Sequence, residues 1–509
     1  MVGISIAVFG LFHGDVGAQD GESTALTIYS TASPGAIPPE LYRPVLGGSN
    51  RGSNSWNRIP GYALVKQERN VDLGQPRTTI RFTDVAALID PTTVAFKSLT
   101  DPDTTHVLEQ NYEFDLVSTD KLMEKYIDRV ITVDQVQGDK IETIRGTLLS
   151  TLGGLVLKME DGGVQVIRSY ANVRFPELPG GLITRPTLVW DVATQRIGRH
   201  RVRVTYETKA ITWWTDYNII FTEGKNANSG FLDIGAWVSI INKSGATYKD
   251  AKLKLIAGDV HRAPQPQPVM RYMKRGVAMA ESAMMDTGFQ EKSFFEYHLY
   301  TLGRSTTLLN NSTKQIELFP AARNVPCEKV MVYYGQGSRY PVYGRPMMDR
   351  NFGVQSNKKI DIYLRFKNEK KVGMGMPLPS GRIRVSQRDK ADDTLEFIGE
   401  DVIDHTPKNE EVLIKLGSAF DVVGERVQVD FKVDNRRDWM DETIEIKLRN
   451  HKEESVKVIV KENLYRWTNW KIVNATHPHE TIDSRTIHFP VEIEPEGEVT
   501  IRYTVHYSW

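Results

Sequence analysis

Short runs in which apolar and polar residues alternate recur through most of the chain, and this period of two is typical of β-strands that bury one face. Examples are "RVRVTYETKA", "VQVDFKVDN" and "ETIEIKLRN", which are bounded by turn residues. One stretch differs, because Leu122, Met123, Tyr126 and Ile127 in "DKLMEKYIDRV" recur at helical spacing. We therefore predict a mainly β protein with one short helix.

The strand-like runs fall into several modules, which 509 residues are enough to supply with separate cores. We predict an N-terminal β module over residues 58–118 and a short helix with a small SH3-like barrel over 119–178. A larger β-sandwich region follows over 179–390, and an immunoglobulin-like sandwich over 391–509. The Met-rich segment 262–290 lacks strand periodicity and is predicted to be a loop.

The N-terminus has the pattern of an export signal. An apolar stretch from Val2 to Phe12 is followed by Val16-Gly17-Ala18, a small-residue pattern at which a signal peptidase cuts. We predict a signal peptide over residues 1–18 and, because "GGSNRGSNSWN" is rich in Gly, Ser and Asn, a flexible tether over 19–57. No other run is long and apolar enough for a membrane-spanning helix, so we expect no integral span.

Composition narrows the partners and the chemistry. The 64 basic residues balance the 64 acidic ones, so no basic excess favours nucleic acid. The lone Cys327 cannot form an internal disulfide and is predicted to pack as a small apolar residue. "GMGM" at residues 373–376 lacks the third glycine of a dinucleotide-binding loop, and we expect no cofactor.

Two groups of residues are candidates for metal binding. His477 and His479 form a His-x-His pair, with His488 as a third possible ligand for zinc, although Pro478 favours a turn at this point. The methionines of the Met-rich segment are soft ligands that suit Cu(I), or they pack on irregular apolar surface. They are Met270, Met273, Met279, Met284 and Met285.

Two adjacent tryptophans in "ITWWTDYNIIF" must point to opposite faces of a strand. The face of Trp213 is nearly all apolar and is predicted to be core: Ile211, Tyr217, Ile219 and Phe221. Trp214 shares its face with Thr212, Asp216 and Asn218. We predict Trp214 and Trp237 as binding residues, unless a second layer covers Trp214. The following strand is expected to bury its even positions, Leu232, Ile234, Val238 and Ile240.

Three longer motifs resemble the DUF4139 family, a domain of unknown function that includes mucoidy-inhibitor-A-like exported proteins. They are "LPGGLITRPTLVW", "GAWVSIINKSGATYKDAKLKLIAGDV" and "FEYHLYTLGRSTTLLNNSTKQIELF", and the resemblance covers roughly residues 58–509. It implies an exported bacterial β protein with an N-terminal β module and a larger C-terminal β portion. It implies no reaction and no catalytic residue.

The sequence thus favours an exported, non-enzymatic β-rich interaction module that contacts an envelope protein or polysaccharide, as a monomer or a homo-oligomer. One alternative is a metal-dependent hydrolase that uses His477, His479 and His488. A second is an outer-membrane β-barrel, which the aromatic-ended final strand "IRYTVHYSW" suggests.

Overall fold

The computed structural model describes most of the chain, and all structural statements concern these ranges: residues 22–30, 37, 59–115, 117–137, 140–177, 179–180, 182–258, 260, 289–294, 297–336, 344–389, 391–436 and 438–509. The predicted signal peptide lies outside them. So do most of the predicted tether and nearly all of the Met-rich segment, including its five candidate methionines.

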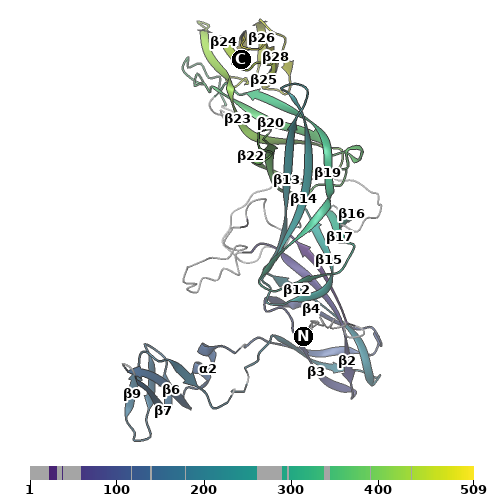
Figure 1. The fold of residues 1–509 in the computed structure, drawn as a ribbon, viewed down its shortest axis with the longest axis vertical. Coiled ribbons are helices and arrows are strands. Elements are labelled where there is room, and N and C mark those ends of the chain that lie inside the picture. The colour runs from purple at the N-terminus through teal and green to yellow at the C-terminus, as the bar shows by residue number, and fades with distance from the viewer. Residues whose placement is uncertain are drawn as a thin grey trace, which may run out of the picture.

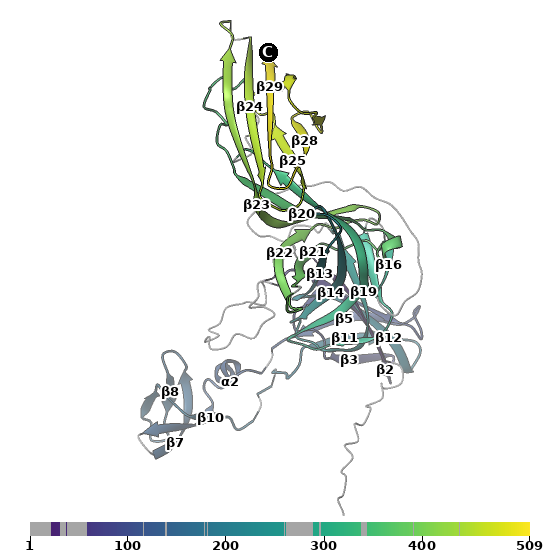
Figure 2. The same cartoon turned by 45° about the horizontal axis from the view of Figure 1, so that its top comes forward.

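The prediction of a mainly β, multi-module fold is confirmed (Figures 1 and 2). In the described part of the chain, α-helix is confined to α2 (Thr119–Lys125), and one 3-10 turn, η2 (Lys370–Val372), follows much later. The Ser118 hydroxyl caps α2 by accepting a hydrogen bond from the Lys121 amide at 3.2 Å. All other regular structure consists of strands.

The first sheet has eight strands. Its order is β16 (Phe289–Phe294), β17 (Tyr297–Leu302), β15 (Tyr248–Ala257), β1 (Ser23–Tyr29), β2 (Tyr62–Leu73), β12 (Gly198–Lys209) and β4 (Ile89–Ser98), and β18 (Thr306–Leu308) pairs separately with β15. A three-stranded sheet of β3 (Arg77–Thr83), β11 (Thr187–Ala193) and β5 (His106–Glu113) lies nearby in the same body.

The expectation of a tether does not hold for β1. This strand pairs in parallel with β15 and antiparallel with β2, inside the sheet rather than at its edge. Leu26 and Ile28 are 0% exposed and belong to the main core. The sequence analysis missed β1 because only these two apolar positions alternate, and because the Gly-, Ser- and Asn-rich run at 47–57 was taken to represent the whole of residues 19–57.

The small module at residues 119–177 has a core of its own. Its sheet order is β10 (Asn172–Arg174), β6 (Val130–Gln137), β7 (Lys140–Ser150), β8 (Leu155–Lys158) and β9 (Val164–Ile167). Met123 and Tyr126, at α2 and its end, pack on this sheet. Gly153 and Gly154 turn the chain between β7 and β8 with φ of 74° and 140°, a conformation that favours glycine.

The third large assembly contains thirteen strands. Its main path is β22 (Leu395–Ile403), β21 (Gly381–Arg388), β13 (Ile211–Glu223), β14 (Ser229–Asn242), β19 (Ser312–Tyr333), β20 (Lys359–Lys367), β23 (Glu411–Val433), β24 (Trp439–Asn450), β29 (Glu498–Ser508) and β26 (Trp470–Ala475). A second layer comprises β25 (Val456–Asn463), β27 (Glu480–Thr481) and β28 (Thr486–Ile493).

Two cores divide this assembly, but not at residue 391 as the domain prediction had it. The 22-residue β19 places Ile316 in the first core and Tyr333 in the second. The 23-residue β23 likewise places Ile414 in the first core and Val422 in the second. The central and C-terminal modules therefore share continuous strands, which join them in Figure 1.

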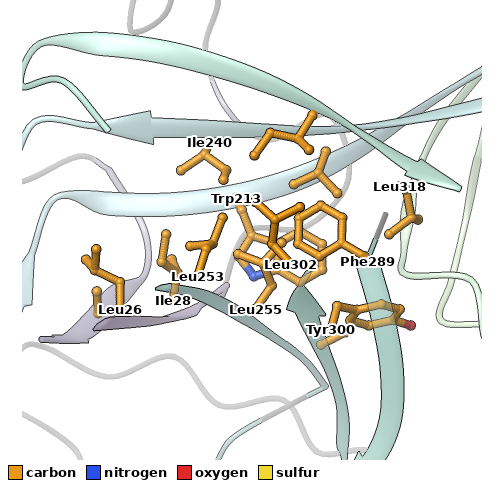
Figure 3. Packing of buried hydrophobic residues seen from close by; sticks show 14 of the residues in the cluster. Leu26, Ile28, Trp213, Ile240, Leu253, Leu255, Phe289, Tyr300, Leu302 and Leu318 are labelled. Atoms are coloured by element: carbon orange, nitrogen blue, oxygen red, sulfur yellow. The ribbon is translucent and has the colours of Figure 1, made fainter. Parts of the chain in front are cut away.

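The main core lies between the first sheet and the β13–β14 hairpin (Figure 3). Leu253 of β15 and Ile240 of β14 lie near Trp213, whose ring meets that of Tyr300 at 6.2 Å. Trp213 is 2% exposed, and burying one large apolar side chain stabilises a fold by about 1.5–3 kcal/mol. The predicted core face of β13 is thereby confirmed, and so are the even positions of β14.

Candidate binding surface

The outer face of the central sheet gathers the polar and aromatic residues that the sequence singled out. Asp216 of β13 lies directly opposite Trp237 of β14 and Arg382 of β21. Directly opposed residues of paired strands share one face of a sheet. These residues form a row across the sheet. Glu317 of β19 lies opposite Trp237, and Val402 of β22 lies opposite Arg382, so the row crosses five strands.

Asp216 is the centre of a polar network. Its Oδ2 accepts hydrogen bonds from Trp214 Nε1 at 2.8 Å and from the Ser239 hydroxyl at 3.4 Å. Its Oδ1 lies 3.6 Å from Arg382 Nε and 3.5 Å from Arg384 Nη1. Asp216 is only 8% exposed, so the two guanidinium groups offset the cost of burying its charge.

Arg382 keeps one donor without a partner. Its Nε is buried and has no hydrogen bond among the described residues, because 3.6 Å to Asp216 is too long for one. An unpaired buried donor is costly, and native structures usually satisfy such groups with protein, water or ligand. This donor lies beside the exposed part of the row.

Trp237 supplies the aromatic part of the surface. Its side chain is 40% exposed, as expected for an odd position on a strand that buries its even positions. Gly235 precedes it by two positions on the same face, and a Cβ built at Gly235 would meet only the Asn218 carbonyl oxygen, at 3.9 Å. The sheet surface beside the indole, at Gly235, therefore carries no side chain and is open. We call Asp216, Gly235, Trp237, Arg382 and Arg384 the Trp237 surface.

The prediction of an exposed Trp214 is wrong. Trp214 is 9% exposed and forms a small cluster with other buried apolar residues: Ile37, Ile59, Ala210 and Ile241. Two of them, Ile37 and Ile59, come from the N-terminal part of the chain and cover this tryptophan as a second layer. Trp214 therefore packs against Ile37 and Ile59 and positions Asp216 rather than offering a surface of its own.

The three candidate metal ligands do not converge. Thr476 Oγ1 contacts His477 Nδ1 at 3.0 Å, whereas the His479 ring packs 5.7 Å from that of Phe489. His488, next to Phe489 on β28, pairs across the strands with Glu480 and Lys461. Among the described residues, no three His, Cys, Asp or Glu side chains form a group that could hold a metal ion.

The structure reveals a serine–histidine contact that no sequence motif marks. Ser98 Oγ lies 3.0 Å from His200 Nδ1, and both residues are 0% exposed. The other ring nitrogen, Nε2, lies 2.6 Å from the Arg196 carbonyl oxygen, where a catalytic triad would have a carboxylate. A buried pair held by a backbone carbonyl cannot reach a substrate, so we assign it to structure.

Cys327 packs in the main core and is 9% exposed, as predicted for a small apolar residue. Burial raises the pKa of its thiol to about 12, and the nearby Lys329 only partly opposes this effect. The thiolate form that a nucleophile requires is therefore disfavoured.

The fold and this surface define a multi-module β protein with an open, aromatic and polar sheet face. Comparison with family models, with curated proteins and with solved structures gives no match to the chain. The resemblance to the DUF4139 family therefore stays a prediction. In the described ranges, no helix has the length and apolar character needed to cross a membrane.

Proposed function

We propose that the protein is an exported, non-enzymatic interaction module that binds an envelope saccharide chain at the Trp237 surface. The observation that carries this proposal is the exposed indole of Trp237 beside the open strip at Gly235. An aromatic ring offers a flat apolar face to a sugar ring, and surrounding polar groups can bond its hydroxyls. Asp216 and Arg382 in the same row, and Arg384 in the next one, supply acceptors and donors.

The metal-dependent hydrolase gains no support from the geometry. Zinc sites require three or four convergent ligands, and His477, His479 and His488 have separate contacts. The export signal and the envelope location rest on the sequence pattern of the N-terminus.

Affinity electrophoresis tests the proposal, with the full chain run through gels that contain dextran, hydroxyethyl cellulose or soluble peptidoglycan strands. Trp237→Ala should abolish retardation by the glycan that binds, or weaken it at least about tenfold, since exposed aromatic anchors dominate many binding surfaces. Phe231→Ala is the matched control, because Phe231 lies on the same strand and face and is 43% exposed.

Equal retardation of both variants would place binding elsewhere and contradict the proposal. A photo-cross-linking residue at position 237 distinguishes the partner classes in intact envelopes. A reproducible cross-link to one protein, without retardation by any glycan, would overturn the saccharide assignment.

A further inference from the structure

We infer that the outer face of the first sheet is a second binding site, specific for an acidic polysaccharide that carries carboxylates. The inference does not depend on the Trp237 surface, which lies on another sheet. Five cations mark the site: Lys66, Lys97, Arg201, Arg203 and Lys252. We call this group the basic face.

Strand register places these side chains together. Lys252 of β15 and Lys66 of β2 are both in register with Ala25 of β1, so a single strand separates the two lysines. Arg203 of β12 is opposite Glu68 on one side and Lys97 of β4 on the other. At about 4.8 Å per strand, the cations from β15 to β4 span about 19 Å, the length of a few sugar units.

The basic face points away from the protein interior. The alternate residues of the same strands, Val65, Val204 and Leu253, are 0% exposed and lie in the main core. By contrast, the side chains of Lys66 and Arg201 are each 45% exposed, and that of Arg203 is 37% exposed. The cations are therefore accessible to a ligand.

One carboxylate in this group shows what the arginines recognise. Arg201 and Arg203 each bond Glu68 through Nε and Nη2, with Nη2 distances of 2.8 Å, on different carboxylate oxygens. Lys66 Nζ lies 3.9 Å from the same group. Glu68 thus compensates one charge of three, and Nη1 of both arginines remains outside these bonds.

The remaining cations are not compensated. Within the described ranges, neither Lys97 nor Lys252 has a carboxylate at salt-bridge distance. Lys97 also lies directly opposite Arg203, a like-charge arrangement that destabilises a sheet. The chain as a whole has no net charge, so the excess of cations over Glu68 within this group is local, and a polyanion would relieve the repulsion.

The intervening residues favour a polysaccharide over a lipid surface. Ser23, Ala25 and Thr205 lie between the cations, and these small side chains offer no apolar group for insertion into a bilayer. An extended polymer whose carboxylates repeat along its length matches this series of cations.

Polygalacturonate oligosaccharides are the probe, and the same oligosaccharides fully methyl-esterified are the uncharged control. We expect the full chain to bind the acid form at low salt, to release it as salt rises, and not to bind the ester. The triple variant Lys66→Gln/Lys97→Gln/Lys252→Gln should bind about eightfold more weakly, because each surface charge contact contributes roughly twofold.

The matched control is Lys432→Gln/Lys457→Gln/Lys471→Gln, which removes the same charge from exposed lysines of the C-terminal sandwich. It should leave the affinity unchanged, and so should Trp237→Ala, which separates this site from the proposed function. Equal weakening of both triple variants, binding of the ester, or no binding of the acid at about 20 mM salt would overturn the inference. Binding of phosphatidylglycerol vesicles but not polygalacturonate would also overturn it and identify a membrane surface.

Discussion

Trp214 Nε1 donates a hydrogen bond of 2.8 Å to Asp216 Oδ2, which fixes two side chains on one face of β13 to each other. The same indole packs with Ile37 and Ile59 from the stretch between β1 and β2. The packing of Ile37 and Ile59 and the geometry of the Trp237 surface therefore depend on one residue. Trp214 positions the surface without being exposed in it.

Substitutions at Trp214 should separate packing from hydrogen bonding. Trp214→Ala should reduce the free energy of unfolding by about 3–5 kcal/mol, because it removes a large buried ring. Trp214→Phe keeps most of the apolar contact and should cost about 1–2 kcal/mol, because Asp216 Oδ2 loses the indole donor and keeps only the longer bond from the Ser239 hydroxyl. Chemical denaturation monitored by circular dichroism measures both losses, and Trp237→Ala is the exposed control. A negligible effect of Trp214→Ala would show that the cluster does not stabilise the fold.

Much of the fold follows from local pattern, because a period of two identifies strands without knowledge of their partners. The buried face of β13 and the even positions of β14 were predictable in this way. Pairing was not, since β1 bonds to β15, more than two hundred residues away in the sequence, and only two of its side chains alternate into the core. The shared strands β19 and β23 were also hidden, since a strand's length does not reveal that it crosses from one core to the next.

The binding surface was predictable only in part. The polar residues around Trp214 indicated a polar face, and Trp237 is indeed exposed. However, Arg382 of this row and the neighbouring Arg384 come from β21, and Arg382 is 166 positions beyond Asp216 in the sequence. A parallel pairing between such distant strands leaves no signal in local residue spacing. The packing of Ile37 and Ile59 over Trp214 leaves no such signal either.

Arg426 and Glu462 form a buried ion pair in the C-terminal sandwich, 2.9 Å apart, with side-chain exposures of 2% and 0%. The Tyr503 hydroxyl also donates to Glu462. Glu462→Gln should destabilise this sandwich by about 3–5 kcal/mol, because it leaves a buried guanidinium without its counter-charge. Hydrogen exchange of β24 and β25 amides measures the change.

A double variant controls for the loss of the charge itself. Arg426→Met combined with Glu462→Gln removes both charges but keeps an acceptor for Tyr503, and it should recover most of the protection. A double variant as unstable as Glu462→Gln would assign the cost to packing instead.

Removal of a core side chain from β1 tests its place in the first sheet. Ile28→Ala should lower the free energy of unfolding by about 2–5 kcal/mol, since Ile28 is 0% exposed within the main core. The neighbouring Thr27→Ala alters the opposite, partly exposed face and should cost less than about 1 kcal/mol. Similar small effects of both substitutions would mean that β1 contributes little to the core.

Cys327 should be unreactive in the folded protein. Its thiol is buried and its pKa is raised to about 12, so little thiolate forms at pH 8. We expect a disulfide reagent such as Ellman's reagent to label the native chain slowly and the guanidinium-denatured chain at once, with release of one thiol per chain. Rapid labelling of the native chain would contradict the packing of Cys327 on β19.

His488 should make the stability of the C-terminal sandwich depend on pH. Burial and then the charge of Lys461 lower its pKa below the ordinary 6.5, and Glu480 and Asp483 oppose the shift only partly. A lowered pKa means that the folded state holds the neutral ring more firmly than the unfolded state does. The stability that the neutral His488 ring contributes is fully present above pH 6.5. It decreases as pH falls from 6.5 through the lowered pKa of the folded state, and below that pKa it is lost.

The free energy of unfolding should therefore decrease between about pH 7 and pH 5, and His488→Gln should flatten this part of the profile. Denaturation of the wild type and of His488→Gln at a series of pH values measures the difference between their free energies of unfolding. The contributions of the other histidines cancel in this difference. His451→Gln is the control, because it makes the same substitution at an exposed position before β25 and should keep the wild-type slope. A slope that survives in His488→Gln would assign the pH dependence to another group.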